Sequence, residues 1–386
     1  MSVMVRYLIA LLVVLLLIPA VTRVFSANAQ ITLPVKPFDS HEVNADRSIT
    51  FRLYAPTARE VKVTCDCLDA PLRMKRDEQG LWSVTTPVLA PEIYGYVFNV
   101  DGATILDPIN GNTRPNILLL GSEVVVHGAE PQPWELQESA HGNVTYHTYT
   151  TRIAKHLPEN QEPYVVYTPP SYDPHKAGGY PVLYLLHGWS DYGDGWVTVG
   201  RAERLLDSMI DSGKAVPMIV VMPMAYGDYD FVNHGFGVWQ ESAKVTANTQ
   251  LFTQMLLHEV LPAVEREYNT SKSSRERAIA GLSMGGLESL TIGLTHPELF
   301  DYVGGFSSAV FMPYSTMGVN AESAKKHLRL LWIACGTGDA LLKPNQEFIA
   351  AARTAGLNPV AIETPGRHEW PVWRDNLLHF APQLFR

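Results

Sequence analysis

The segment AIAGLSMGGLES, residues 278–289, places one serine between two glycines. Its apolar opening predicts the end of a strand, and the helix formers that follow predict a helix. A serine at such a junction forms a nucleophile elbow, a turn so sharp that Gly281 and Gly285 must lack side chains. The start of the helix directs its dipole and free N–H groups at the hydroxyl. The pattern predicts Ser283 as a nucleophile, the alternative being a glycine-rich turn that only lets a helix pack on a sheet.

A serine hydroxyl attacks only when a base takes its proton, and in this arrangement the order along the chain is serine, acid, histidine. His368 lies in a loop directly after the apolar run PVAIE, where the base is expected. His296 and His379 fall at the end of one helical segment and inside another. Asp339 follows the apolar run LLWIACG and is predicted to orient the histidine, although an aspartate there could also cap a helix. Asp301 precedes its strand and is the weaker alternative.

The tetrahedral intermediate formed by attack needs two preorganised hydrogen-bond donors for its oxyanion. One is the backbone N–H of Met284, directly after the nucleophile. The other is expected from the loop after an earlier strand. The run LYLLHGWSD ends its apolar part at His187-Gly188, which makes the backbone N–H of Trp189 the candidate.

Two regions of the chain with different hydrophobic patterns, called here the first and the second block, must position these residues. Residues 30–127 carry short alternating runs bounded by Pro, Gly or Asp, which predict an all-β sandwich. Residues 128–141 are rich in proline and polar residues and are predicted to be a linker. In residues 142–386, apolar runs alternate with amphipathic segments, which predicts a doubly wound, mostly parallel sheet covered by helices on both faces.

The first 29 residues have the layout of a secretory signal peptide. An uncharged apolar run lies between Arg6 and Arg23, and Ala27-Asn28-Ala29 supplies a small-residue cleavage site. A membrane anchor is the alternative, but the run is short and Pro19 interrupts it. We therefore expect a secreted or periplasmic protein with no stable membrane association after cleavage. Its oligomeric state cannot be predicted.

Charge and cysteine content exclude several function classes. The formal net charge is −9, so the sequence does not predict the positively charged surface that nucleic-acid binding requires. Cys65 and Cys67 are two residues apart on a predicted strand, and because a bridge between them would close a very small ring we expect two thiols. Cys335 lies in an apolar run and is expected to be buried. No Cys/His cluster has zinc spacing, and we expect neither a metal nor a cofactor.

Taken together, LLHGWSDYGDGW, PMIVVMP, AIAGLSMGG, ACGTGD and HEWPVWRDNL resemble the esterase D-like branch of the α/β-hydrolases. That branch includes carbohydrate esterase family 1, with its feruloyl and acetyl-xylan esterases, as well as enterochelin esterases and mycolyltransferases. The resemblance implies Ser283, Asp339 and His368 as triad, with the N–H groups of Trp189 and Met284 as oxyanion hole. The block with FRLYAPTAREVKV and YGYVFNVDGATILDPIN resembles the immunoglobulin-like carbohydrate-binding module that precedes isoamylases.

The resemblance implies a secreted serine carboxylesterase that removes feruloyl or acetyl groups from plant cell-wall polysaccharide through an acyl-enzyme. A siderophore esterase or an acyltransferase of the same fold is the alternative, and a glycan-binding protein with an inactive hydrolase domain is the non-enzymatic one. Aromatic residues near the active end are the expected substrate contacts, namely Tyr192, Tyr226, Trp239 and Trp370. The aromatic residues of the first block are expected to be sandwich core rather than a sugar-stacking platform, namely Tyr54, Trp82, Tyr94, Tyr96 and Phe98.

Overall fold

The computed structural model describes residues 37–311 and 314–386, within which Ser40–Arg386 forms one compact unit. The predicted signal peptide, residues 1–29, lies outside the described residues. None of the helices in the described part of the chain is both long and apolar enough to cross a bilayer.

The first block folds into two antiparallel sheets, as predicted for an all-β sandwich. One sheet has the strand order β1-β2-β6-β5 and the other β4-β3-β7-β10-β9, with β8 beside β7. Alternate residues point into the core between the sheets, and Phe51, Val63 and Phe98 are fully buried there. The strands are His41–Val43 (β1), Ile49–Tyr54 (β2), Val61–Cys65 (β3), Leu72–Arg73 (β4), Lys75–Arg76 (β5), Leu81–Thr85 (β6), Glu92–Val100 (β7), Ala103–Ile105 (β8), Thr113–Arg114 (β9) and Gly121–Val126 (β10).

Four of the five aromatic residues expected in the core of this block lie there. Trp82, Tyr94, Tyr96 and Phe98 are all buried in the sandwich core, and Tyr54 is half-buried. The rings of these four buried residues therefore belong to the core between the two sheets, and Tyr54 lies outside that core cluster.

The prediction of two thiols at Cys65 and Cys67 is wrong, because the structure joins them in a disulfide. The prediction assumed that both residues lie on one strand. Strand β3 instead ends at Cys65, and the chain turns so that the Leu68 N–H donates to the Cys65 carbonyl oxygen over 3.1 Å. The turn brings the two Cα atoms to 5.1 Å, within the range that a disulfide spans. Cys335 is a buried free thiol, as expected.

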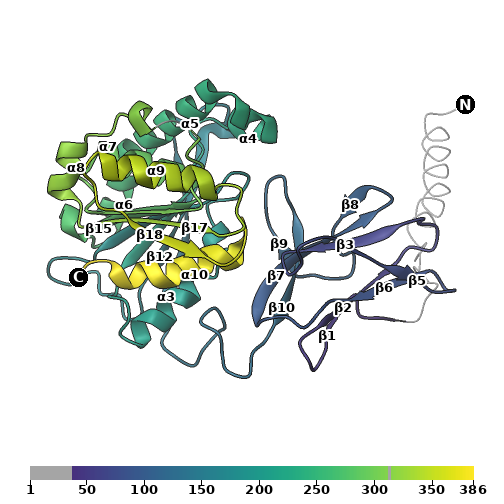
Figure 1. Ribbon diagram of the computed structural model, residues 1–386. Helices are drawn as coiled ribbons and strands as arrows, with labels where there is room; N and C mark the ends of the chain where they lie inside the picture. Colours follow the sequence, from purple (N-terminus) through teal and green to yellow (C-terminus); the bar gives the residue numbers. More distant parts are fainter. Residues whose placement is uncertain (1–36, 312–313) are drawn as a thin grey trace, which may run out of the picture. The chain divides into compact units, whose positions relative to one another are not determined.

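The second block is built on an eight-stranded sheet with the order β11-β12-β14-β13-β15-β16-β17-β18 (Figure 1). Strands β11, β12 and β14 pair antiparallel, and from β14 through β13 to β18 all neighbours are parallel. The strands are Asn143–Thr150 (β11), Gln161–Thr168 (β12), Val182–Leu186 (β13), Ile219–Pro223 (β14), Arg277–Leu282 (β15), Tyr302–Phe306 (β16), Leu330–Gly336 (β17) and Val360–Thr364 (β18).

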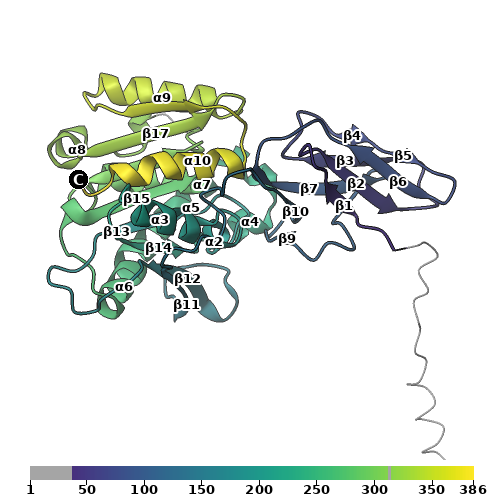
Figure 2. The ribbon, with the colours of Figure 1, turned by 90° about the horizontal axis from the view of Figure 1, so that it is seen from below.

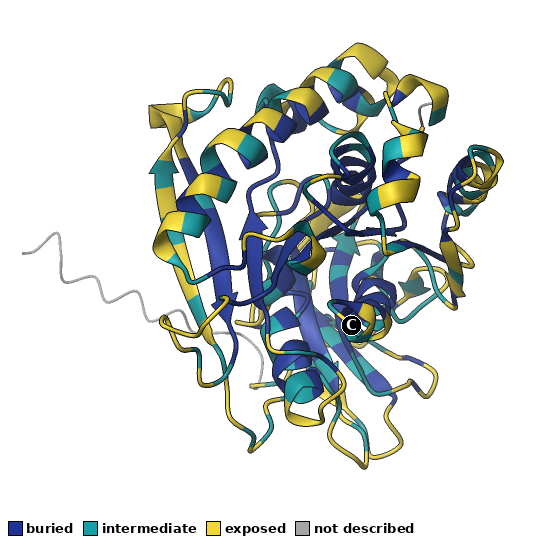
Figure 3. Cartoon of the chain, turned by 90° about the vertical axis from the view of Figure 1, so that its left-hand side faces the viewer, coloured by how far each residue is buried: buried dark blue, intermediate teal, exposed yellow. Residues whose placement is uncertain are grey.

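Helices cover both faces of this sheet, which confirms the predicted doubly wound architecture (Figures 1 and 2). On one face Ala202–Asp211 (α3) and Trp370–Phe380 (α10) pack on Leu183 and Leu185, and on the other Met284–Thr295 (α7) and its neighbours pack on Tyr184 and Leu186. Figure 3 shows buried central strands and helices with one buried and one exposed face. The other helices are Gly195–Thr198 (α2), Asp230–Asn233 (α4), Ser242–Met255 (α5), Leu261–Glu267 (α6), Ala321–His327 (α8) and Leu342–Thr354 (α9), and Leu256–Val260 forms a π-helical turn between α5 and α6.

Side chains from the first block and the predicted linker are part of the core of the second. Ile93 on β7 and Trp134 in residues 128–141 join the hydrophobic cluster around α3 and α10. Arg374 on α10 is 2% exposed and donates hydrogen bonds to Glu92 Oε1 at 2.7 Å, to the Ile93 carbonyl at 3.0 Å and to the Val199 carbonyl at 3.0 Å. The two blocks are therefore joined by buried apolar and charged contacts as well as by the chain.

Replacing Arg374 with alanine should lower the free energy of unfolding by about 3 kcal/mol, because it removes the cation that pairs with Glu92 and the donor to two buried carbonyl groups. Denaturant unfolding of the full chain measures this change. Lys343→Ala is the control, since this side chain is 84% exposed in a weak ion pair and its loss should change stability by no more than about 0.5 kcal/mol. Equal stabilities of the two variants would show that Arg374 does not hold the blocks together.

Candidate active site

The turn around Ser283 has the geometry that its flanking glycines predict. Strand β15 ends at Leu282, helix α7 begins at Met284, and Ser283 between them has a φ of 52°, in the left-handed region. A Cβ on Gly281 would lie 2.5 Å from the Gly285 carbonyl, and one on Gly285 would lie 2.5 Å from the His187 carbonyl oxygen. Both positions must therefore be glycine for the turn to close, and the turn holds the Ser283 side chain at the carboxyl end of the sheet.

His368 and Asp339 reach this serine from two neighbouring strand ends. His368, after β18, places Nε2 3.0 Å from Ser283 Oγ, and its Nδ1 lies 2.8 Å from Asp339 Oδ2. The second oxygen of Asp339 accepts a hydrogen bond from the Leu341 N–H at 2.8 Å. Since an ionised carboxylate can only accept, Nδ1 carries the imidazole proton and Nε2 is left to accept one from the serine.

The environment of Asp339 keeps it ionised. Burial alone would raise the pKa of this carboxyl, but the hydrogen bond and charge of His368, with the Leu341 N–H, hold the pKa below its ordinary value. The ring of His368 also packs edge-on against Trp373, with ring centroids 5.0 Å apart. The imidazole is thus fixed in both orientation and tautomer.

The two candidate oxyanion donors lie beside the serine and keep their N–H groups unused. Met284 is the first residue of α7, so no carbonyl four residues earlier within the helix can accept its N–H. Trp189 follows Gly188, where a Cβ would lie only 3.4 Å from the Cβ of Ser283. The hydrogen bonds of the described residues include none donated by either backbone amide.

His187 fixes the loop that carries the Trp189 amide. The Ala225 N–H donates to its Nε2 at 2.9 Å, so Nδ1 bears the proton and donates to the Gly188 carbonyl at 2.8 Å. Burial lowers the pKa of His187 to about 4, and the ring stays neutral. His187 therefore ties the loop to the end of β14 and, being fully buried, is not a second base.

Ser283 and His368 open into a cavity of about 850 Å³. Its walls come from both blocks. Trp189, Asp191 and Trp370 line it from the second block, and Asn116 with Leu118–Leu120 lines it from the first. The three leucines are 45%, 68% and 52% exposed, an unusual run of open apolar side chains. Part of the cavity wall thus comes from residues about 160 positions before the nucleophile.

Of the four aromatic residues expected to contact substrate, the structure places only Trp370 in this cavity. Tyr226 is fully buried and donates its hydroxyl hydrogen bond to the Asp191 carbonyl at 3.2 Å. Trp239 packs edge-on against Phe231 and Phe311. Tyr192 is 40% exposed and does not line the cavity. Tyr226, Trp239 and Tyr192 are therefore not in position to contact a substrate in this cavity.

Asp191 is a buried carboxyl of the cavity that sequence reasoning missed. Asn116 donates to its Oδ1 at 2.7 Å, and a Cβ on Gly188 would lie 3.5 Å from its Oδ2. Burial raises the pKa of Asp191 to about 7, although Asn116 and the charges of Arg114 and His368 oppose the rise. No motif marks Asp191, because its environment depends on a segment 75 residues earlier in the chain.

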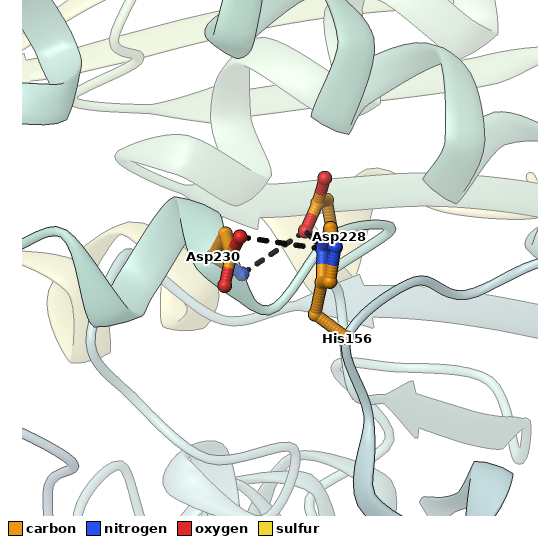
Figure 4. Close-up of side chains that lie close together, drawn as sticks. All are labelled: His156, Asp228 and Asp230. Carbon is orange, nitrogen blue, oxygen red and sulfur yellow. Dashed lines mark hydrogen bonds and ion pairs between the residues drawn. The ribbon is translucent and has the colours of Figure 1, made fainter.

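One cluster of the described residues could offer three ligand atoms to a metal. His156, Asp228 and Asp230 lie within 4.8 Å of one another (Figure 4). His156 Nδ1 donates to Asp228 Oδ1 at 2.7 Å, and this hydrogen bond, with the two negative charges, raises the pKa of the histidine. His156 also lies 3.4 Å from Asp230 Oδ2, so the three side chains form an exposed ion-pair cluster. None of the three lines the Ser283 cavity.

Comparison with known proteins adds family relationships to this geometry. A family model described as putative esterase matches residues 155–384, and one described as carbohydrate-binding module 48, the isoamylase N-terminal domain, matches residues 37–111. An endo-1,4-β-xylanase/feruloyl esterase of Xylanibacter ruminicola is 30% identical over 355 residues, which are 89% of this chain and 46% of that protein. This chain thus spans about half the length of that relative. The ferri-bacillibactin esterase of Bacillus subtilis is 25% identical over 222 residues, which are 52% of this chain and 63% of that protein.

Solved structures share the fold at lower identity. An enterobactin esterase of Shigella flexneri is 19% identical with a TM-score of 0.65, over 91% of this chain and 95% of that one. A CE1 ferulic acid esterase of Anaeromyces mucronatus is 22% identical with a TM-score of 0.56, over 66% of this chain and 96% of that one. The chain therefore belongs to the putative esterase family, with an α/β-hydrolase fold that follows an immunoglobulin-like β-sandwich of the carbohydrate-binding-module-48 type.

Proposed function

We propose that this protein is a secreted serine carboxylesterase that hydrolyses feruloyl or acetyl esters on plant cell-wall polysaccharide. The observation that supports it most is the unbroken chain of contacts from Asp339 through His368 to Ser283, at 2.8 and 3.0 Å, at the edge of a large open cavity. The relation to a xylanase/feruloyl esterase and to a carbohydrate-binding module supports the substrate class.

In the first half-reaction, Ser283 Oγ attacks the ester carbonyl carbon while its proton moves to His368 Nε2. The negative charge that develops on the carbonyl oxygen is stabilised by the N–H groups of Trp189 and Met284. The bond to the alcohol oxygen then breaks, and that oxygen takes the proton from Nε2. The alcohol leaves, and the acyl group remains on Ser283.

In the second half-reaction, water attacks the acyl-enzyme and gives its proton to His368 Nε2. The tetrahedral intermediate collapses, Ser283 Oγ recovers the proton, and the carboxylic acid leaves. Asp339 keeps the imidazole in the required tautomer throughout and stabilises the imidazolium that forms. The chemistry uses only groups of the chain and water.

The cavity supports an ester whose acyl or alcohol part is large and partly apolar. Trp370 and Trp189 offer indole rings, and Leu118–Leu120 add apolar side chains to the lining of the same cavity. Because these leucines belong to the first block, we propose that it contacts substrate through them and not through the aromatic residues of its core.

Removing residues 30–139 would take away this wall and expose the surface that Ile93 and Trp134 cover, so the truncated chain should lose activity even on small esters.

Ser283→Ala should lower turnover of a short aryl ester by about 10⁴-fold or more, because it removes the hydroxyl that is hydrogen-bonded to His368 Nε2. The same assay on methyl ferulate, acetylated xylan and a catecholate trilactone defines the substrate class. Preference for the first two supports the proposal, and preference for the trilactone would identify a siderophore esterase instead. Substantial activity in Ser283→Ala would reject Ser283 as nucleophile, and acyl transfer to an added sugar in preference to water would identify an acyltransferase.

His368→Ala should be as damaging as the loss of the serine, since it removes the base that is hydrogen-bonded to the Ser283 hydroxyl. His379→Ala is the matched control, because this side chain is 62% exposed on α10 and bonds only to its own helix. Its turnover should stay within a few-fold of the unchanged protein. The reverse ranking in steady-state kinetics would mean that the base is misassigned.

Asp339→Asn should reduce turnover by roughly 10³- to 10⁴-fold, because the amide N–H would favour the wrong imidazole tautomer. Since the pKa of Asp339 lies below its ordinary value, the carboxylate is fully ionised in the unchanged protein, and the deficit should persist from roughly pH 6 to 8. Rates measured across that range test both points. Near-normal rates for Asp339→Asn would require a different carboxylate to orient His368.

A further inference from the structure

Arg367, the residue directly before the catalytic histidine, reaches from the second block to the first. Its Nη2 donates to the carbonyl oxygen of Leu68 at 2.7 Å and to that of Asp66 at 3.2 Å. Both acceptors belong to the turn Cys65–Leu68, which the disulfide between Cys65 and Cys67 closes. A single side chain therefore connects the histidine loop to a main-chain turn some 300 residues earlier in the chain.

The turn Cys65–Leu68 is held rigidly enough to serve as an anchor. The Asp66 N–H donates to the Gly95 carbonyl at 2.9 Å, and the Gly95 N–H donates back to Asp66 Oδ2 at 3.1 Å. The same carboxylate oxygen pairs with Arg114 at 2.5 Å. The disulfide further restricts the backbone of the turn, so that the carbonyl groups of Asp66 and Leu68 keep a fixed direction.

The histidine loop, between the end of β18 and the start of α10, is bonded mainly to itself and to the neighbouring strand end, and Arg367 Nη2 also lies 3.5 Å from Glu369 Oε2. The Arg367 N–H donates to Glu369 Oε1 at 3.1 Å, and the Glu369 N–H donates to the Arg367 carbonyl at 3.0 Å. The Gly338 N–H donates to the carbonyl of Gly366, which has a φ of 124°. Most of these bonds stay within the loop, and the Arg367 guanidinium ties it to the first block.

The rate depends on where the base is held as well as on its presence. A displacement of about 1 Å between a catalytic group and its partner can cost about 100-fold in rate, because proton transfer needs an aligned hydrogen bond. His368 must keep its contacts to Ser283 and Asp339 at 3.0 and 2.8 Å simultaneously. If the loop that carries His368 could shift, at least one of these two hydrogen bonds would be broken.

We propose that Arg367 is a positioning residue for His368 and that the disulfide-closed turn Cys65–Leu68 is its anchor, so that reduction of the disulfide lowers turnover. The inference rests on the proposed function, since it takes His368 as the base. Reduction breaks one S–S bond: a dithiol supplies two electrons and two protons, Cys65 and Cys67 become thiols, and the dithiol becomes its own cyclic disulfide.

The first test compares Arg367→Ala with Arg367→Lys and with Arg353→Ala, which removes an exposed arginine on α9 away from the cavity. For a short aryl ester, Arg367→Ala should lower kcat by roughly 10- to 100-fold with little change in KM. The lysine variant should recover part of the loss because it keeps one charged donor, and Arg353→Ala should match the unchanged protein. A raised KM at normal kcat would show that Arg367 contacts substrate instead, and normal kcat in Arg367→Ala would overturn the positioning role.

The second test uses the disulfide and does not depend on the arginine variants folding. Dithiothreitol should lower kcat of the folded, full-length protein, and removal of the reductant with reoxidation should restore it. Cys65→Ser/Cys67→Ser should start at the lowered kcat and show no response to dithiothreitol. A normal kcat in the double variant would overturn the anchor.

His368→Ala, measured in the same assay, separates this inference from the proposed function. If His368→Ala is inactive while Arg367→Ala and the double serine variant are normal, only the positioning inference fails. If His368→Ala is itself active, the proposed function fails as well.

Discussion

The whole site depends on one steric constraint, the sharp turn at which β15 becomes α7. The turn leaves room for no Cβ at Gly281 or Gly285, where one would approach main-chain atoms within 2.5 Å, and it holds Ser283 at a φ of 52°. In the parallel sheet the carboxyl ends of β17 and β18 lie at the same edge as the end of β15. The residues that follow them, Asp339 and His368, are therefore close to the serine. The free N–H of Met284 follows from the same turn, since it is the first of the helix.

Around this turn, groups with no part in bond breaking keep the reacting ones in place. His187 is held neutral by burial and fixes the loop of Trp189, while Trp373 packs against the ring of His368. The first block takes part too: Asn116 holds the buried carboxyl of Asp191, and the turn Cys65–Leu68 receives the side chain of Arg367. The β-sandwich therefore lines part of the cavity and contacts the loop that carries His368. Four aromatic residues of the sandwich are buried in its core, and its exposed leucines at 118–120 line the cavity that holds Ser283 and His368.

The catalytic candidates could be predicted because each depends on local sequence. Ser283 is marked by its glycines, and Asp339 and His368 each follow an apolar run that forms a strand, so strand order alone brings them together. The aromatic contacts could not be predicted, since burial of Tyr226 and the packing of Trp239 depend on neighbours that periodicity does not reveal. The Cys65–Cys67 disulfide was missed because β3 ends at Cys65 and does not continue to Cys67 as the prediction assumed. Asn116, Leu118–Leu120 and Arg367 act across the contact between two blocks, which no pattern within either block encodes.

The central claim is that Ser283 carries the acyl group between two half-reactions, and trapping that intermediate tests it most directly. The protein is mixed with an aryl ester, quenched in acid during turnover and digested, and the peptides are weighed by mass spectrometry. The account predicts a mass increase equal to the acyl group on the peptide containing Ser283, formed at the rate of the initial burst of alcohol release. Turnover with the acyl group on another residue, or with no acylated peptide while the burst is present, would contradict it.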